Sequence, residues 1–353
     1  MRFYFINIFL LTSFLLPITA FAQTPVIDSI LKVVATNVSD TVKIRGYADL
    51  AKEFEKVDHD KAGIYAKQAH EISLKNKDQK WIIITCATLA AFEQNSGNLE
   101  KAEKFFLESI AIANKLNRPD AETRINNNLA MLYQEMNRYD DAIKTYLKAA
   151  VFNKKSGNEM DLAKNYNNLG NAYREQEMYD MGLKYYIMSI EIRERIKDRA
   201  GISSCYKNMA IVYENLKRYD ESTKMYRTAL VIDKELGNKK GEATIYNNMA
   251  VVFNSRKMYD SAIPLLELAL KLREELKQKS SIARTLLNLA KAYGDQEKFE
   301  QAEKYLMRAL PYTKESNDQG ALMMSYAQLA LVNSGRKKYD VALDYCYKAI
   351  LQA

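Results

Sequence analysis

Apolar and small side chains recur along most of the chain with a period of 40 residues, from about residue 83 to the end. The first recurring pattern spaces its apolar residues by three, four and seven, which puts them on one face of a helix. It reads Asn126-x-x-Leu129-Ala130-x-x-Tyr133 and begins again at Tyr166, Tyr206, Tyr246 and Leu286. This pattern predicts a first helix in each repeat, with a large and a small buried residue at fixed places.

A second pattern follows each first helix and predicts a turn and a second helix. One copy begins Tyr139-Asp140-Asp141-Ala142 and continues to Tyr146 and Ala149 on the same helical face. Small residues at fixed places let two helices approach closely, while the large residues fill the space beside them. Further copies begin at His59, Asn98, Tyr179, Tyr219, Tyr259, Phe299 and Tyr339.

Turn-forming residues stand at the predicted joints between helix pairs, as in Ser156-Gly157-Asn158 and Gly237-Asn238. Pro119 suits the start of a helix, where its missing N–H is not needed. Pro311 lies well inside a predicted second helix, so we expect it to kink that helix or end it early.

The patterns divide the chain into three parts. Residues 1–22 read as a signal peptide, residues 23–43 as a capping helix and linker, and residues 44–353 as a solenoid of eight repeats, the last incomplete. Solenoids need a polar terminal face for solubility, which residues 25–37 supply at the first repeat. The last repeat lacks such a cap, so we expect either that the chain is a fragment or that this face contacts a partner.

The first residues have the three regions of a secretory signal. Arg2 is the positive charge, residues 3–16 are the apolar stretch, and Ala20-Phe21-Ala22 is the cleavage site. The apolar run is shorter than the roughly 20 residues needed to span a bilayer, which favours cleavage after Ala22 over an uncleaved anchor. No later stretch approaches that length, so the sequence predicts a periplasmic or secreted protein without a membrane span after cleavage.

The repeat resembles the tetratricopeptide repeat family, in which an aromatic residue precedes L-G-x2-Y and A-x3-F. The resemblance covers residues 44–353, and its 40-residue unit is similar to the long repeats of kinesin light chains. The usual Trp and the Pro after the second helix are absent, although the packing residues remain. The resemblance implies an all-α, right-handed solenoid superhelix of eight helix-turn-helix repeats.

Composition and candidate chemistry argue against catalysis. The chain has two histidines, His59 and His70, with no acid or cysteine cluster around them, which predicts no metal site, and it carries no nucleophile or phosphate-loop motif. We therefore expect no enzyme and no cofactor. Most of the 24 tyrosines fall at packing positions, so we interpret them as core residues.

The distribution of charge argues against a nucleic-acid partner. The net charge is +8, but the basic residues are interleaved with acids along the chain. Nucleic-acid binders cluster their basic residues on one face, so no nucleic-acid partner is predicted.

The three cysteines are not expected to form disulfides. Cys86, Cys205 and Cys346 are about three repeats apart, which is too far for a disulfide, and they are expected to be buried thiols.

One polar position recurs without an obvious structural reason. Asparagine is a mediocre helix former, yet it stands before the Leu or Met of five successive first helices, and Gln328 continues the row. In the long-repeat relatives, asparagines at the matching place bind the backbone of an extended peptide, and the resemblance implies the same role here. The alternative is that each amide binds a neighbouring helix. The residues are Asn128, Asn168, Asn208, Asn248 and Asn288.

Further polar residues extend this face around the centre of the row. Their spacings of three and four place them beside the asparagines, and they would suit an acidic side chain or a carboxyl terminus. Elsewhere the face carries apolar or acidic residues such as Met131, Ile211 and Glu135, so a uniform anion groove is not predicted. The added residues are Lys164, Asn167, Asn171, Arg174 and Lys207.

Together these features predict an exported, non-enzymatic scaffold that binds an extended protein or peptide segment in its concave groove. A second hypothesis is an extracytoplasmic sensory or input region of a bacterial signal-transduction protein. The export signal, the short helix and the long repeats resemble the input half of membrane-bound sensor kinases. In that case the membrane and output domains would follow residue 353.

Overall fold

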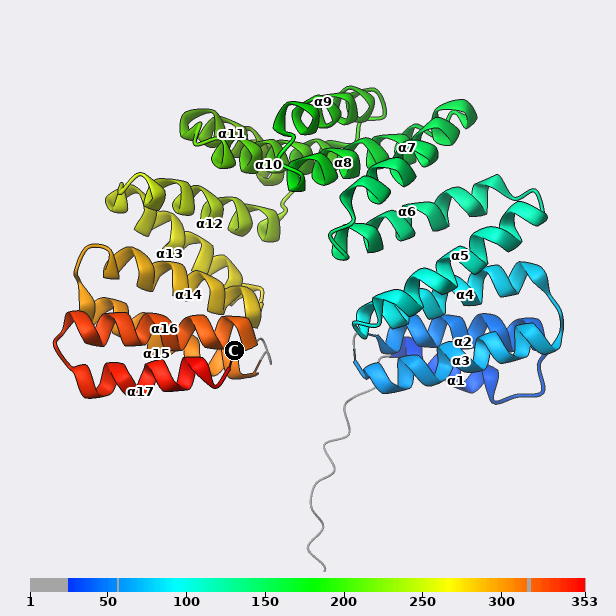
Figure 1. Ribbon diagram of the computed structural model, residues 1–353, viewed down its shortest axis with the longest axis horizontal. Coiled ribbons are helices and arrows are strands. Elements are labelled where there is room, and N and C mark those ends of the chain that lie inside the picture. Colours follow the sequence, from blue (N-terminus) through cyan, green and yellow to red (C-terminus); the bar gives the residue numbers. More distant parts are fainter. Residues whose placement is uncertain (1–24, 56, 316–318, 353) are drawn as a thin grey trace, which may run out of the picture. The chain divides into compact units, whose positions relative to one another are not determined.

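The computed structural model describes residues 25–55, 57–315 and 319–352, and every regular element within these ranges is an α-helix (Figure 1). The chain divides into two compact units, one ending at Met136 and the other beginning at Asn137. The expected signal peptide at residues 1–22 lies outside the described residues. The predicted all-α repeat architecture is confirmed.

The first unit contains a capping helix and the first helices of the repeat array. Helix α1 packs against α2, where Ile27 and Val34 are buried with Leu50 and Phe54. Helix α2 begins at Asp40, and α6 begins at Pro119, as expected for a proline at a helix start. The helices are α1 (Pro25–Val34), α2 (Asp40–Phe54), α3 (His59–Lys75), α4 (Gln79–Asn95), α5 (Leu99–Lys115) and α6 (Pro119–Glu135).

The second unit continues the alternation without a change of helix type. Even-numbered helices from α2 onward are the first helices of the repeats, and odd-numbered helices from α3 onward are the second helices. The unit contains α7 (Tyr139–Ser156), α8 (Glu159–Glu175), α9 (Tyr179–Arg195), α10 (Arg199–Asn215), α11 (Tyr219–Glu235), α12 (Lys239–Ser255), α13 (Tyr259–Glu275), α14 (Lys279–Gly294), α15 (Phe299–Glu315), α16 (Gln319–Gly335) and α17 (Tyr339–Ile350).

A left-handed residue in the connections sets where each helix ends. Lys217, Gly237 and Lys257 have φ values of 58°, 63° and 57° and stand 20 residues apart. The residue after each left-handed residue donates its backbone N–H to a carbonyl in the last turn of the helix. The N–H of Arg218, for example, donates to the carbonyl of Tyr213 at 2.8 Å. This closure satisfies carbonyl groups that the end of a helix leaves free. Because the closure recurs at this interval, helices of nearly equal length follow one another.

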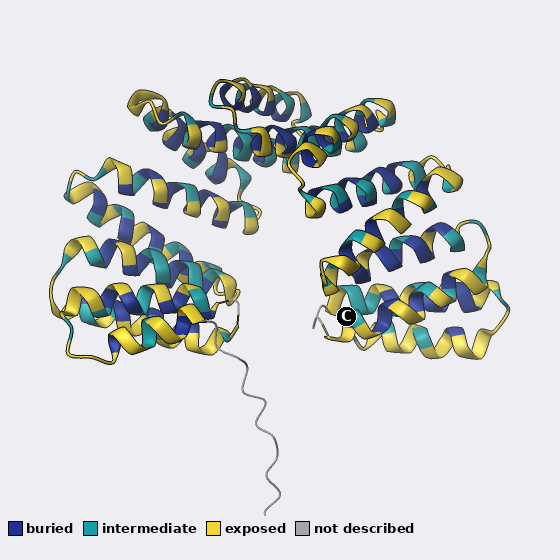
Figure 2. Cartoon of the chain, turned by 180° about the vertical axis from the view of Figure 1, so that it is seen from behind, coloured by how far each residue is buried: buried dark blue, intermediate teal, exposed yellow. Residues whose placement is uncertain are grey.

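Each helix pair is held by a large side chain on one helix facing a small residue on the other. Tyr146, Tyr186 and Tyr226 are fully buried at the same place in three successive second helices. A Cβ atom at Gly170 of α8 would lie 2.5 Å from the ring of Tyr186 on α9. Buried positions accordingly lie where paired helices face each other (Figure 2). The interpretation of these tyrosines as core residues is confirmed.

Two sequence expectations are wrong. Helix α15 does not end early at Pro311 but continues to Glu315, because Ala309 and Leu310 before the proline and Thr313 after it are all buried. Cys346 is exposed on α17, the last described helix, whereas Cys86 and Cys205 are buried as expected. Burial, with Glu108 nearby, raises the pKa of the Cys86 thiol to about 12.

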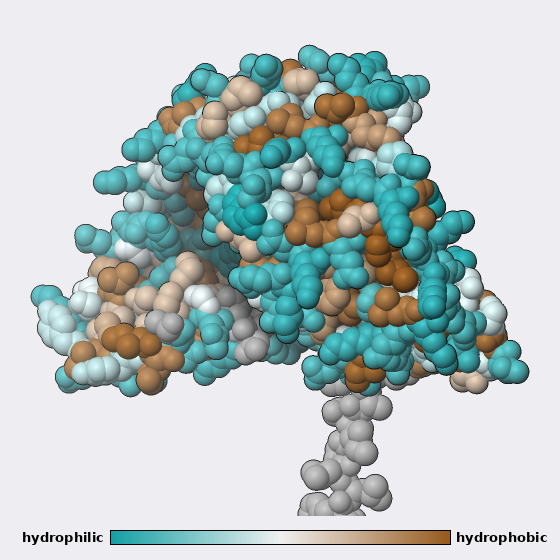
Figure 3. All heavy atoms as spheres, turned by 45° about the vertical axis from the view of Figure 1, so that its right-hand side comes forward, coloured by the Kyte–Doolittle hydropathy of each residue, from teal (hydrophilic) through white to brown (hydrophobic). Residues whose placement is uncertain are grey.

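The surface mixes polar side chains with separate apolar patches (Figure 3). Exposed apolar residues include Ile84 on α4 and Leu331 on α16. Among the helices of the described ranges, none combines the length and apolar character needed to cross a bilayer.

Substituting Gly170 by Ala should lower the free energy of unfolding by about 1–3 kcal/mol, because the added methyl group overlaps the ring of Tyr186. Urea denaturation followed by circular dichroism measures the change. Gly294→Ala is the matched control, since its Cβ would meet only ordinary contacts at 3.9 and 4.0 Å. That variant should be unchanged or more stable, and a Gly170→Ala protein as stable as the parent would contradict the packing described here.

Candidate functional site

The first helices of successive repeats lie next to one another. In the first unit α2 contacts α4 and α4 contacts α6, and in the second unit α8 contacts α10, α12 contacts α14 and α14 contacts α16. Second helices show no comparable contact in the part of the chain that the structure describes. The first helices therefore form the inner face of each unit, and the predicted binding residues lie on them.

The predicted asparagines lie at one helical position on consecutive first helices. Asn168, Asn208, Asn248 and Asn288 are partly buried on α8, α10, α12 and α14, and we call these four the amide row. In the first unit, Asn128 is exposed on α6. Their common place follows from the 40-residue period, which returns the same helical position at every repeat.

Neighbouring first helices are tied by chains of amide groups. The Nδ2 of Asn208 donates to the Oδ1 of Asn167 at 3.0 Å, and the Nδ2 of Asn167 donates to Asn168 at 3.4 Å. The same arrangement returns two repeats later. There the Nδ2 of Asn288 donates to Asn247 at 3.0 Å, and the Nδ2 of Asn247 donates to Asn248 at 3.3 Å.

These hydrogen bonds use only some of the donors and acceptors of each side-chain amide. A side-chain amide carries two N–H donors and an oxygen that accepts twice. Burial raises the pKa of Tyr146 and Tyr226, and in Tyr146 a hydrogen bond with Asn168 partly lowers it again. The amides therefore join helices and still keep donors or acceptors for a ligand.

The cations predicted beside the amide row are already neutralised within the array. The Nζ of Lys164 lies 2.9 Å from Asp161, and the Nζ of Lys207 lies 3.0 Å from Asp233, which is fully buried. Arg174 pairs with Glu175, the next residue along the helix. The charges around the centre of the row are therefore balanced before any ligand arrives.

Asn171 also takes part in the packing. Its Oδ1 accepts a hydrogen bond of 2.7 Å from the hydroxyl of Tyr186 on α9. The five predicted residues around the row thus lie together on α8 and α10, each in contact with another side chain of the array.

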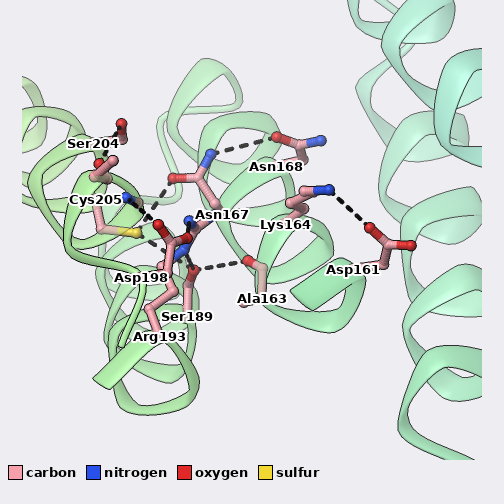
Figure 4. A network of polar contacts seen from close by, with 12 residues as sticks. Asp161, Ala163, Lys164, Asn167, Asn168, Ser189, Arg193, Asp198, Ser204 and Cys205 are labelled. Atoms are coloured by element: carbon pink, nitrogen blue, oxygen red, sulfur yellow. Dashed lines mark hydrogen bonds and ion pairs between the residues drawn. The ribbon is translucent and has the colours of Figure 1, made fainter. Parts of the chain in front are cut away.

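A buried polar network lies beneath this part of the face (Figure 4). Arg193 of α9 pairs with Asp198, and its Nε donates to the hydroxyl of Ser189 at 3.0 Å. The thiol of Cys205 donates to the Oδ1 of Asn167 at 3.5 Å, which joins the network to the amide row. Sequence reasoning missed it, although a polar residue at a buried helical position recurs here every 40 residues, as Asn153, Arg193, Asp233 and Arg273.

The first unit has a groove that sequence reasoning did not predict. It has a volume of about 640 Å³ and is lined mainly by α2, α4 and α6. Small and apolar residues line it together with polar residues, among them Asn128. Ile84 in the groove is 46% exposed. Lining residues include Ala48, Lys52, Ile84, Ala87, Arg124 and Asn128.

The described residues offer no cluster of three or more His, Cys, Asp or Glu side chains suited to a metal ion. The two histidines bond hydroxyl groups instead. His59 Nε2 lies 2.8 Å from the Oγ of Ser96, and His70 Nδ1 lies 3.0 Å from the Oγ1 of Thr85.

Solved structures with this fold include a quorum sensor and a signal-transduction ATPase. The quorum sensor NprR from B. thuringiensis, in its apo form, is 16% identical, with 93% of this chain and 97% of that chain covered and a TM-score of 0.66. A signal-transduction ATPase with a tetratricopeptide repeat sensor from Pyrococcus horikoshii is 18% identical over 95% of this chain and 53% of that chain, with a TM-score of 0.61. Apo RapI is 15% identical over 78% and 98%, with a TM-score of 0.60. Identities this low show a shared fold.

Comparison with the sequences of curated proteins gives no match. The family model described as tetratricopeptide repeat matches residues 82–150, 161–235 and 241–315, which together make up more than half of the chain. The matched segments contain the helix pairs whose packing residues suggested the resemblance. The chain belongs to the tetratricopeptide repeat family.

Proposed function

We propose that this chain is a non-enzymatic scaffold whose inner face binds an extended segment of a partner protein or peptide. The observation that carries the proposal is the groove of about 640 Å³ on the first unit. Because three successive first helices line it, an elongated ligand fits it better than a compact one. Membership of a family of protein-interaction repeats supports the same conclusion.

The groove suits a segment with small or apolar side chains. Ala48, Ile84 and Ala87 offer apolar surface, and burying such surface drives association. Lys52, Arg124 and Asn128 also line it and can bind backbone carbonyl groups or acidic side chains of the ligand, while Asp49 and Glu55 can bind its N–H groups or basic side chains. A mixture of apolar and polar lining residues is usual in a protein interface.

In the second unit the amide row offers a different mode of binding. An amide group can pair with both the C=O and the N–H of a peptide backbone, so it holds an extended chain regardless of the ligand's sequence. The partly exposed side chains of Asn168, Asn208, Asn248 and Asn288 stand one repeat apart, which supports this role.

A second candidate is a sensory or input region of a bacterial signal-transduction protein, exported by the segment at residues 1–22. The similarity in fold to a quorum sensor and to the tetratricopeptide repeat sensor of a signal-transduction ATPase favours it. In this candidate the bound segment is a signal, and the array transmits its presence to another domain.

Substituting Ile84 by Asp should weaken peptide capture by the first unit about tenfold, because the carboxylate must lose its hydration when a ligand covers the groove. Peptides selected from a random displayed library provide the ligands, and fluorescence anisotropy measures their affinity. Val151→Asp is the control, since Val151 is exposed on the second helix α7. If the Ile84→Asp and Val151→Asp variants bound the peptides with equal affinity, the groove would not be the binding site.

Replacing Asn168, Asn208 and Asn248 together by Ala should weaken capture of a partner by the second unit, because the peptide backbone loses its amide contacts. The amides also bond one another, so the free energy of unfolding should fall by about 1 kcal/mol for each lost hydrogen bond, without unfolding the array. Titration calorimetry and thermal melting separate the two effects. A lower melting temperature with unchanged binding would show that the row is structural.

Export can be tested on the native protein from an envelope fraction. Its N-terminal sequence should begin at Gln23, since the predicted cleavage site follows Ala22. A native protein that retains Met1 contradicts processing at this site.

The coding sequence beyond codon 353 separates the two candidates. An in-frame hydrophobic helix followed by an output domain supports the sensory candidate, whereas a stop codon there contradicts it.

A further inference from the structure

His70 occupies a place in α3 where every later second helix carries an apolar residue. The residues found there at intervals of 40 are Ile110, Ala150, Ile190, Leu230, Leu270, Leu310 and Ile350. In the middle of the array this place is buried, as at Ile190 and Leu270. An ionisable ring therefore stands where the repeat has a core residue.

The ring is tied to α4 through two buried hydroxyl groups. The Nδ1 of His70 lies 3.0 Å from the Oγ1 of Thr85, and that oxygen lies 3.0 Å from the Oγ of Ser73. The hydroxyl of Ser73 donates to the backbone carbonyl of His70 at 2.7 Å. Both hydroxyl groups belong to residues with no exposed surface. The three residues thus form a closed chain of polar contacts across the interface between α3 and α4.

The neutral ring of His70 carries its hydrogen on Nδ1. The single hydroxyl proton of Ser73 is used on the carbonyl of His70, so the contact between Ser73 and Thr85 is a hydrogen bond only if Thr85 donates. Thr85 then has no proton left for the imidazole, and Nδ1 must donate to it. Nε2 holds the lone pair, and acid adds the second proton there.

The surroundings of the ring offer little to a cation. His70 is partly buried, and the ring of Phe105 on α5 meets it edge to face, with 6.2 Å between the centroids. The thiol of Cys86 lies 3.9 Å from Nδ1 and stays neutral, because burial raises its pKa to about 12. Neutral and apolar groups do not replace the water that a charged imidazole loses.

Two carboxylates act on the ring but do not compensate for the lost water. Burial lowers the pKa of His70 below its ordinary value, and Glu108 of α5 and Glu71 of α3 offset only part of this effect. The described residues of α2 add no charge that acts on the ring. The folded first unit therefore favours the neutral form of His70.

We propose that His70 is a pH-responsive element that weakens the packing of α3 on α4 in mild acid. Protonation puts a cation at a place that the rest of the array fills with an apolar side chain, and only the folded unit bears the cost. Because α4 also lines the groove with Ile84 and Ala87, this packing holds part of the groove in position. The response does not require that the groove binds a peptide, so it can be tested without a ligand.

The direction of the effect follows from the pKa of His70 in the two states. In the unfolded chain the side chain titrates near its ordinary value of 6.5, and in the folded unit its pKa is lower. The neutral ring therefore contributes stability that is fully present above the unfolded value. This contribution is lost as the pH falls through the lower, folded value.

Hydrogen exchange of the whole chain, measured by mass spectrometry from about pH 7.5 to about pH 5.5, tests the proposal. After correction for the intrinsic exchange rate at each pH, the fraction of open α3 and α4 should rise by about threefold as the pH falls. Helices α10 to α13 contain no histidine and should keep the same protection.

Two substitutions of His70 remove the titrating group in different ways. His70→Leu supplies the residue that Leu270 and Leu310 provide in later repeats. His70→Asn keeps an N–H donor for Thr85 on a side chain that does not titrate. Both variants should show equal opening of α3 and α4 across the pH range, and His70→Asn decides if His70→Leu does not fold.

The chain has one other histidine, which provides the control. His59 is exposed at the start of α3, so His59→Gln should keep the full response. A parent protein whose α3 and α4 open equally at both pH values overturns the proposal. A response that persists in the His70 variants comes from carboxylates and overturns it as well, and a response lost in His59→Gln assigns it to the wrong ring.

Discussion

The close approach of paired helices, set by a small residue facing a large one, is the constraint on which the rest of this structure depends. Gly170 against Tyr186 is one close example, because a single methyl group at Gly170 would overlap the ring. Repeating this contact every 40 residues places each first helix beside the next. The inner faces, with the amide row and the groove, exist because the first helices are held at this spacing.

The inner faces differ in chemistry although the helices repeat. The first unit presents an apolar groove around Ile84 and Ala87, whereas the centre of the second unit presents amides and balanced ion pairs. Further along, α14 carries the exposed cations Arg284 and Lys291. A regular scaffold with locally varied side chains can thus present different chemistry to a ligand in each unit.

The sequence predicted the helices, their pairing and the register of the asparagines, because all three depend on spacing along the chain. The pairing of Lys164 with Asp161 was also readable, since three residues separate them on one helix. The pairing of Lys207 with Asp233 and the amide bond from Asn208 to Asn167 join different helices, so they require the packed structure. The groove was missed because alanine and isoleucine fit a core and a binding surface equally well.

The central claim is that the first helices provide the binding surface. A crystal structure of the protein with a selected peptide tests it most directly. The account predicts an extended peptide lying across successive first helices, in contact with Ile84 and Asn128 in the first unit or with Asn248 and Asn288 in the second. A peptide bound to the outer surfaces of the second helices, with these residues left uncovered, would contradict it.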